Sequence, residues 1–488
     1  MHLLPGITVI VPFIFAIFLL VFCRRNEAAM KVMALAGSAL SFLASAAMLP
    51  ALAGGQTLGT GMHYMSFPLA ISFQADGISI FFAVIFSFCF MLAFIYSFGY
   101  LAHGHGKLRY YVLMLFSQGS ILGVVMAYSL FGLFLFFELM AIISYGLVIH
   151  EEDDKAMYAG SKYLFMTIVA GLAIFFGLAV TYFLGGRLDF VAGGYIEASP
   201  LVGYALFAFL IGFGLKAGMF PLHIWLPDAH PAAPAAVSAL LSGCMIKTGA
   251  YGFIRLIHYV FTVEAVQSIG FDTILLWLSI ITILLGSALA LQQDQLKRRL
   301  AYSSVAQIGY VLLGIAMLSE QALMGALFHI FSHALMKGAL FLCAGAIMVQ
   351  TGKKYISEMR GIGFEMPVTM LAFTLAAVTM VGIPPFNAFI SKWHLAMASL
   401  DSGQTFLVAV LIVSSLLNAL YYFPIVVNAF FARDVMEPGS KKRHWLRDEV
   451  PAGMVWSTAL LAVLCVAFAF IQPHWPVVFA AKISAVIF

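Results

Sequence analysis

Apolar runs of bilayer-spanning length recur along almost the whole chain. A transmembrane helix needs about 20 predominantly apolar residues, and about fourteen segments of that kind can be laid out in the 488-residue sequence. Within a bilayer only helices and closed barrels satisfy every backbone polar group. Hydrophobic residues make up 63% of the chain and charged residues 9%, which excludes an ordinary soluble domain. The sequence therefore predicts an all-α polytopic membrane protein with about fourteen transmembrane helices.

The predicted spans follow one another with short connections. They cover approximately residues 3–23, 28–51, 77–101, 109–128, 130–150, 159–184, 201–221, 235–260, 272–292, 299–318, 322–350, 367–400, 404–431 and 452–472. The eleventh and twelfth are longer than a simple span requires, so we expect both to be broken. We expect a single membrane domain over residues 1–488, divided into N-terminal helices (1–105), a first repeat (109–260), an inverted second repeat (272–431) and a C-terminal helix (452–472).

The basic residues fall almost entirely on one side of this layout. With the N-terminus outside, the inner connections hold Arg24, Arg25, Lys31, Lys107, Arg109, Lys155, Lys162, Lys297, Arg298, Arg299, Lys353, Lys354, Arg360, Arg433, Lys441, Lys442, Arg443 and Arg447. The outer side keeps Arg187 and Lys482, with Arg255 as a third candidate. Because cytoplasmic loops carry the excess of Lys and Arg, the pattern predicts an even number of spans with both termini outside.

The sequence lacks the common signatures of cofactor chemistry. Its five cysteines are scattered singly through apolar segments, without a C-x-x-C or a His/Cys cluster, so an iron–sulfur cluster, a zinc site and a disulfide framework are not expected. Neither a phosphate-binding loop nor a dinucleotide fingerprint is present. The net charge of +4 is explained by the inner connections. We therefore expect no metal, no cofactor and no nucleic acid bound by this chain.

Two of the spans are interrupted by proline beside a lysine at membrane depth. Lys216 precedes Gly218-Met-Phe-Pro221, and Gly382-Ile-Pro384-Pro385 precedes Lys392. Helix breaks near 221 and 384 are expected, because interrupted helices at membrane depth line protein or a water-filled cavity. The two G-x-x-P breaks lie five spans apart, and an odd offset requires inverted copies. The pattern predicts two inverted five-helix repeats of the kind found in transporters.

Glu138 and Lys216 are ionisable residues deep within predicted spans. Intramembrane ionisable residues are costly and usually functional. One interpretation is a static Glu–Lys pair that fixes helix packing. The other is a carboxylate that modulates the proton affinity of Lys216, since a desolvated lysine exchanges protons readily.

Four more ionisable residues lie within the eighth and eleventh predicted spans. His329, His333 and Lys337 are spaced i, i+4, i+8, so they share one helix face with rungs about 6 Å apart along the axis. Such a ladder suits proton relay, although buried histidines also serve as hydrogen-bonded packing residues. Lys247 lies near the middle of the eighth span. It is a further relay candidate, or a lysine that extends its amine to the interface.

Lys392 after the second break is a candidate terminal site, or a lysine that extends to the outer interface. On the tenth span, Tyr302, Ser303, Ser304 and Gln307 could hold water, and Ser and Gln also join helices.

His223, Asp228 and His230 follow the first break. They are candidates for an inner access point for protons, or caps of short helices, and the sequence does not separate these two roles.

Several stretches resemble the antiporter-like subunit family of NADH–quinone oxidoreductases, membrane-bound energy-converting hydrogenases and Mrp-type cation/proton antiporters. The matching stretches are FFELM, LKAGMFPLHIWLPDAHPAAPAAVSALLSG, MIKTGAYG, DQLKRRLAYSSVAQIGY, HIFSHALMKGALFL and GIPPFNAFISKW, in register from about 110 to 400. The resemblance implies that Glu138 and Lys216 form a coupling pair, that Lys247, His329 and His333 form a central relay, and that Lys392 is the terminal proton site. Some family members carry glutamate at that last position.

The resemblance also implies a role and partners. The chain would be a proton-translocating subunit of a redox-driven membrane complex, of the hydrogenase or NADH–quinone oxidoreductase type, in a bacterial or archaeal cytoplasmic membrane. Electron chemistry would belong to peripheral iron–sulfur subunits, with other membrane subunits as neighbours and H⁺, with Na⁺ as an alternative, as the ion. The alternative function is a subunit of an Mrp-type Na⁺/H⁺ antiporter. A structural membrane anchor is a third possibility, against which the lysines in register argue.

Overall fold

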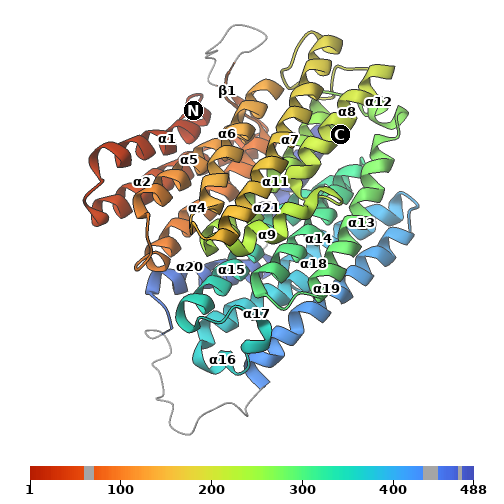
Figure 1. Ribbon diagram of the computed structural model, residues 1–488. Helices are drawn as coiled ribbons and strands as arrows, with labels where there is room; N and C mark the ends of the chain where they lie inside the picture. Colours follow the sequence, from red (N-terminus) through yellow and green to blue (C-terminus); the bar gives the residue numbers. More distant parts are fainter. Residues whose placement is uncertain (60–70, 432–448, 471–474) are drawn as a thin grey trace, which may run out of the picture.

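The protein is described here from a computed structural model, which covers residues 1–59, 71–431, 449–470 and 475–488 (Figure 1). Most of these residues are helical. The helices are α1 (Leu4–Phe22), α2 (Glu27–Ala46), α3 (Leu49–Ala53), α4 (Gly77–Tyr100), α5 (Lys107–Met126), α6 (Leu130–Val148), α7 (Asp154–Gly185), α8 (Pro200–Ala217), η1 (Leu222–Trp225), α9 (Leu226–Ala232), α10 (Ala235–Leu240), η2 (Leu241–Met245), α11 (Lys247–Tyr259), α12 (Val263–Ser268), α13 (Phe271–Leu291), α14 (Leu296–Ala316), α15 (Glu320–Thr351), η3 (Ile356–Glu358), α16 (Ile362–Glu365), α17 (Pro367–Val381), α18 (Asn387–Asp401), α19 (Phe406–Phe431), α20 (Ala452–Phe470) and α21 (Trp475–Ile487).

Two short strands, β1 (Leu58–Gly59) and β2 (Gln74–Ala75), pair antiparallel before α4. The predicted inner basic residues Arg433, Lys441, Lys442, Arg443 and Arg447 lie outside the described residues.

Eleven helices in the described part of the chain are long and apolar enough to cross a membrane. They coincide with eleven of the predicted spans. The other three predicted spans fall on α14, on α17 together with α18, and on α20. The prediction of a helical integral membrane protein is therefore confirmed.

Both predicted helix breaks are present and share their backbone geometry. Helix α8 ends at Ala217 and α17 ends at Val381, each followed by a glycine with positive φ (+75° at Gly218, +84° at Gly382). A left-handed residue at this position ends a helix and is usually glycine. The peptide bonds before Pro221 and Pro385 are cis.

The expectation that the eleventh span is broken was wrong. Helix α15 runs without interruption for 32 residues, from an N-cap at Ser319, whose side chain accepts from the Ala322 amide, to a glycine cap at Gly352 with φ +72°. This stretch contains no proline, so no residue forces a break. The helix is about 48 Å long, which is longer than the bilayer core of roughly 30 Å. Length alone therefore did not indicate a break.

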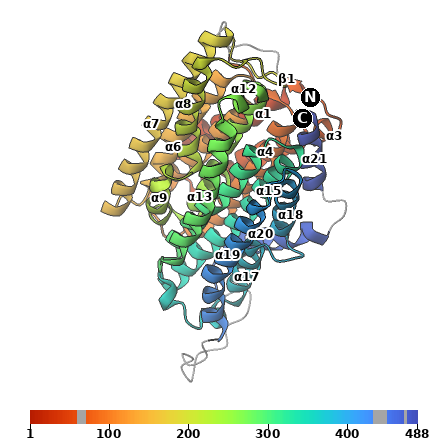
Figure 2. The ribbon, with the colours of Figure 1, turned by 90° about the vertical axis from the view of Figure 1, so that its right-hand side faces the viewer.

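Helix α15 is the centre of the molecule (Figures 1 and 2). It packs against α14, α17, α18, α20 and α21, and against α10 and η2. Because α10, η2 and α11 are also fully enclosed by other helices, Lys247 at the start of α11 is held away from lipid. The short helix α21, which packs on α15 and α4, was not predicted because its 13 residues are too few for a span.

Candidate functional site

Lys247 and His333 are in direct contact inside the bundle. Lys247 is fully buried, and its Nζ donates to the Ser242 carbonyl and contacts His333 Nδ1. Ser242 belongs to the π-helical turn η2, in which the Ile246 amide donates to the Leu241 carbonyl at 3.1 Å. Single π-helical turns are frequent at functional sites. The interpretation of Lys247 as an interfacial lysine does not fit this burial.

His329 continues the chain of contacts one turn before His333. The two imidazole rings stack with centroids 6.1 Å apart. His329 Nδ1 lies 2.8 Å from Ser391 Oγ, and Nε2 lies 3.0 Å from Gln307 Oε1. His333 keeps its Nε2 buried without a partner in the described residues. The i, i+4 spacing thus places both histidines on one face, where they join α11, α14 and α18.

Lys392 lies close to the other end of this chain of contacts. Its Nζ donates to the Val381 carbonyl at 2.9 Å and to Ser415 Oγ at 3.0 Å, next to the break after α17. The carbonyl end of a helix favours a cation. The Tyr310 ring is shared, because it lies 4.9 Å from Lys392 Nζ and 5.3 Å from the His329 ring. Only 7% of Lys392 is exposed, which does not fit an amine at the outer interface.

Lys337, the third rung of the ladder, points to a separate polar group. Its Nζ donates to the Leu300 carbonyl at 2.8 Å, to Ser303 Oγ and to the Tyr422 hydroxyl at 3.3 Å. Ser303 Oγ and the Tyr422 hydroxyl are themselves 2.9 Å apart. The ladder therefore divides, with two histidines on the Lys247–Lys392 chain of contacts and the lysine on a branch.

Lys216 and Glu138 do not form a direct ion pair among the described residues. Lys216 is fully buried beside the break after α8 and donates to the Tyr163 hydroxyl at 2.8 Å. Glu138 is partly buried, and Lys216 is the cation that acts on it electrostatically. Within the described structure its Oε1 has no hydrogen-bond partner. Its carboxylate packs on Gly171, where an added Cβ would lie 2.5 Å from Oε1. The structure thus favours a near but separate carboxylate over a static pair.

The three residues after the first break occupy different environments. Asp228 pairs with Lys162 at 2.7 Å and Arg298 at 3.6 Å. His230 is fully buried, and its ring stacks on Phe341 at 4.7 Å. Neither of its ring nitrogens has a hydrogen-bond partner among the residues that the structure describes. His223 is mostly buried, beside the Phe220 and Tyr302 rings. None of the three side chains caps a helix.

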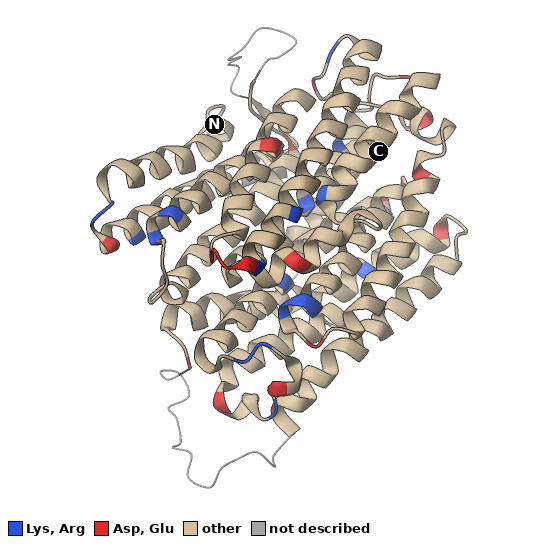
Figure 3. Ribbon diagram, viewed as in Figure 1, with Lys and Arg blue, Asp and Glu red and all other residues tan. Residues whose placement is uncertain are grey.

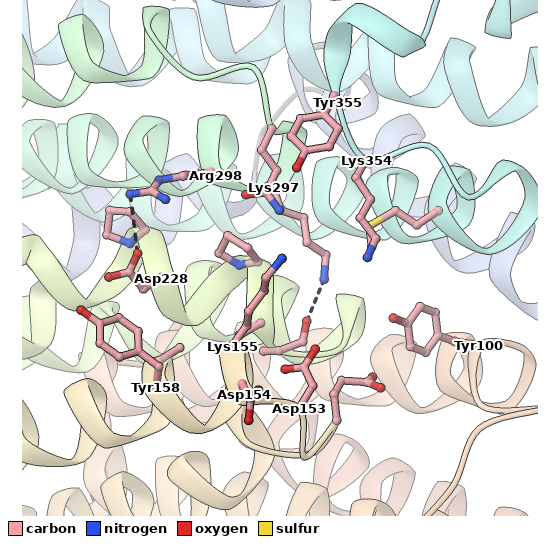
Figure 4. A pocket seen from close by; sticks show the side chains of 18 residues that line it. Tyr100, Asp153, Asp154, Lys155, Tyr158, Asp228, Lys297, Arg298, Lys354 and Tyr355 are labelled. Carbon is pink, nitrogen blue, oxygen red and sulfur yellow. Dashed lines mark hydrogen bonds and ion pairs between the residues drawn. The ribbon is translucent and has the colours of Figure 1, made fainter.

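Asp228 also lines a cavity of about 700 Å³, whose wall includes the basic residues Lys155, Lys297, Arg298 and Lys354 (Figure 4). The cavity lies among the start of α7, helix α9, the start of α14 and the segment after α15.

Residues 127–418, which include every site residue named above from Glu138 to Lys392, match the family described as "NADH:quinone oxidoreductase/Mrp antiporter, TM". The chain belongs to this family. It is 35% identical over 479 residues to NADH-quinone oxidoreductase subunit N of Desulforudis audaxviator, a match that covers 94% of each chain. It is 27% identical to a Na⁺/H⁺ antiporter subunit of Bacillus subtilis, over 94% of this chain and 92% of the relative.

Hydrogenase-4 component B of Escherichia coli is 31% identical, over 82% of this chain and 62% of its own length. Two solved structures share the fold. A chain of the archaeal membrane-bound sulfane sulfur reductase superposes with a TM-score of 0.89 at 24% identity, over 99% of this chain and 97% of that chain. A chain of the Mrp complex from Dietzia sp. DQ12-45-1b gives 0.86 at 22% identity, with the same coverage. The predicted resemblance to the antiporter-like subunits is confirmed.

The antiporter-like site contains residues that the sequence interpretation missed. Tyr163 and Tyr422 hold Lys216 and Lys337, but tyrosines in apolar runs give no signal of their own. Arg255, a candidate for the outer side, is instead 2% exposed and pairs with Asp76 at 2.6 Å, surrounded by Tyr251, Tyr259 and Phe190. Lys297, assigned to an inner connection, is buried as well. Each lies at the edge of an apolar run, where sequence alone does not separate a buried from an exposed cation.

In the described part of the chain, no group of three His, Cys, Asp or Glu side chains is placed to hold a metal ion.

Proposed function

We propose that this chain is a proton-translocating subunit of a redox-driven multisubunit membrane complex of the hydrogenase or NADH–quinone oxidoreductase type. The observation that carries the proposal is the continuous set of contacts from Lys247 through His333 and His329 to Gln307 and Ser391. A desolvated lysine exchanges protons near neutral pH, and histidine is the side chain whose ordinary pKa lies nearest to neutral. A static scaffold has no need of such a chain, because buried polar groups cost stability unless they are paired.

The contacts support a stepwise mechanism. A proton on Lys247 Nζ passes to His333 Nδ1, and His333 releases a proton from its unpartnered Nε2 toward water or His329. His329 is held between Gln307 and Ser391, which orient its ring. Lys392 receives the proton at the second break, near the shared Tyr310 ring. Glu138 acts electrostatically on Lys216, and the two residues form the coupling pair.

The finer architecture belongs to the same proposal. The chain forms fourteen spans with two inverted five-helix repeats and both termini outside, in a bacterial or archaeal cytoplasmic membrane. The similar glycine-terminated breaks at Gly218 and Gly382 support the repeats. Other membrane subunits and peripheral iron–sulfur subunits complete the complex, this chain holds no redox cofactor, and the ion is H⁺.

The proposal is tested with His333→Ala in the assembled complex. Proton uptake by inverted membrane vesicles, normalised to the amount of assembled complex, should fall about a hundredfold, because a positioned proton carrier is lost. His258→Ala is the matched control, since His258 is also buried, has no partner for its Nε2 in the described part of the chain, and lies outside the chain of contacts. If His333→Ala lowers assembly but leaves uptake per complex unchanged, the histidine is structural and the proposal fails.

The alternative, a subunit of an Mrp-type Na⁺/H⁺ antiporter, is favoured by the similarity to the Bacillus subtilis antiporter protein along almost the whole chain. Co-purification separates the two functions. Iron–sulfur partners and proton uptake driven by electron transfer support the first, whereas small membrane partners and proton movement driven by a Na⁺ gradient support the second.

A further inference from the structure

Glu449 is a buried carboxylate that the proton relay does not use. It lies shortly before α20, and only 4% of the residue is exposed. Its Oε1 accepts from the Val368 amide at 2.7 Å, and its Oε2 accepts from the Thr369 amide at 3.0 Å and from the Thr369 hydroxyl at 2.7 Å. Hydrogen bonds to a charged acceptor are roughly twice as strong as neutral ones. The side chain is therefore firmly bound to Val368 and Thr369.

The three donors belong to the first turn of α17. The amides of a first helical turn have no partner within the helix, and the side chain of the residue before the helix usually caps them. In α17 that residue is Met366, which makes no side-chain cap. Glu449 supplies the cap instead, from 80 positions beyond Thr369 in the chain. It also places a negative charge at the end of the helix where the macrodipole favours one.

The other end of α17 holds the relay residue Lys392. The Lys392 amine, which belongs to α18, donates to the Met380 carbonyl at 3.3 Å and to the Val381 carbonyl at 2.9 Å. At Gly382, the next residue, an added Cβ would lie 2.9 Å from Lys392 Cδ. The 15 residues of α17 span about 22 Å. One helix thus connects the Glu449 carboxylate to the partners of Lys392.

Glu449 makes the strongest polar contact between the start of α17 and the rest of the molecule. The helix packs against α15, α19 and α20 (Figures 1 and 2), and apolar packing is non-directional. Two threonine hydroxyls farther along the helix donate to carbonyls of α17 itself. From α15, the Cys343 thiol donates to the Thr369 carbonyl at 3.3 Å, but a thiol is a weak donor.

We propose that Glu449 is a positioning residue, which sets the position of α17 along its axis and thereby the carbonyl partners of Lys392. The inference rests on the proposed function, in which Lys392 is the terminal proton site. Without the carboxylate, the first turn of α17 loses three bonds, and the helix shifts along its axis. A shift of about 1 Å is enough to take the bonds from Lys392 beyond hydrogen-bond range.

Hydrogen–deuterium exchange of the assembled complex tests the positioning directly and needs no transport. Glu449→Gln keeps the size of the side chain but turns an NH2 group toward one of the donors. We expect faster exchange in the first turn of α17 and also severalfold faster exchange at residues 379–383, at the other end of the helix. Glu365→Gln is the matched control, since Glu365 is an exposed carboxylate four positions before Thr369. Faster exchange confined to the first turn would show a local cap and overturn the inference.

Proton uptake by inverted vesicles, normalised to assembled complex, tests the link to Lys392. We expect Glu449→Gln to lower uptake about tenfold, less than the roughly hundredfold effect of a full misplacement, because Ser415 Oγ still accepts from Lys392. In a Lys392→Ala background, Glu449→Gln should lower the residual uptake no further, because the residue that it positions is already gone. Losses that multiply in the double variant would overturn the positioning role.

Thr369→Val serves where Glu449→Gln fails to assemble, because it removes one of the three bonds and keeps the carboxylate. It should change exchange and uptake in the same direction by smaller factors, and unchanged exchange at residues 379–383 would overturn the inference.

His333→Ala keeps the two proposals apart. Loss of uptake in His333→Ala with normal uptake in Glu449→Gln would remove the positioning role and leave the relay standing. Normal uptake in His333→Ala with faster exchange at residues 379–383 in Glu449→Gln would remove the relay and leave Glu449 as the residue that positions α17.

Discussion

Lys216 shows how much the partner of a buried cation matters at the scale of a single residue. Its hydrogen bond goes to the Tyr163 hydroxyl, and the Glu138 carboxylate acts from a distance beyond ion-pair contact. A direct carboxylate partner would favour the charged form of a lysine more strongly than a neutral hydroxyl does. We therefore predict that Lys216→Arg and Lys216→Ala both lower proton uptake by at least about tenfold, and that Glu138→Gln does so too.

The measurement is proton uptake by inverted vesicles containing equal amounts of complex. Arginine is cationic and donates charge-assisted hydrogen bonds, so a static packing role predicts that Lys216→Arg keeps normal uptake while Lys216→Ala loses it. That outcome would rule out proton transfer through Lys216.

The ion pair between Asp76 and the buried Arg255 differs from Lys216, because its two charged groups are in direct contact. Asp76 accepts from Arg255 at 2.6 and 2.8 Å and also accepts from the Ser79 amide, so it caps α4. Removing one partner of a buried pair leaves an uncompensated charge, at about 3–5 kcal/mol. We predict that Asp76→Asn lowers the free energy of unfolding by that amount, measured for the protein in detergent solution. Asp189→Asn, which breaks the more exposed pair with Arg187, should cost no more than about 1 kcal/mol. Equal losses in the two variants would contradict this account.

At the scale of elements, α8 and α11, which carry Lys216 and Lys247, approach each other closely. A Cβ at Gly249 would lie 2.4 Å from the Phe213 carbonyl and 2.7 Å from the Ala217 amide, which are backbone atoms that cannot give way. Gly249→Val should therefore lower the stability of the folded chain by about 1–3 kcal/mol or more. Thermal unfolding in detergent measures this. Gly203→Val on α8, with its nearest neighbour at 3.8 Å, is the control, and a similar loss there would show a general intolerance of valine.

The elements also show which features the sequence could predict. The breaks after Gly218 and Gly382 were predictable, because glycine and proline end helices through local backbone geometry. The histidine face was predictable from its i, i+4 spacing. The Lys216–Tyr163 contact joins residues 53 positions apart, and the burial of Lys297 depends on the packing of α9 against α14. Such features arise from tertiary packing and leave no local pattern.

At the scale of the whole molecule, the termini offer a test of the span count. In both views the two termini lie toward the same end of the bundle (Figures 1 and 2), and lysines and arginines occur both inside the bundle and along its edges (Figure 3). Fourteen spans return the C-terminus to the side of the N-terminus. A fifteenth crossing by α21 would move it to the other side, but 13 residues reach only about 20 Å, short of the roughly 30 Å core.

We therefore predict that both termini face the outside. Reporters fused before residue 1 and after residue 488 should both show the activity of an extracytoplasmic enzyme and no cytoplasmic fluorescence. A third fusion in the connection between α6 and α7 should give the reverse pattern, because the predicted layout places this connection on the inner side, where Lys155 and Lys162 at the start of α7 contribute to the basic excess. A cytoplasmic C-terminus with an external N-terminus would mean an odd number of spans and would contradict the fourteen-span arrangement.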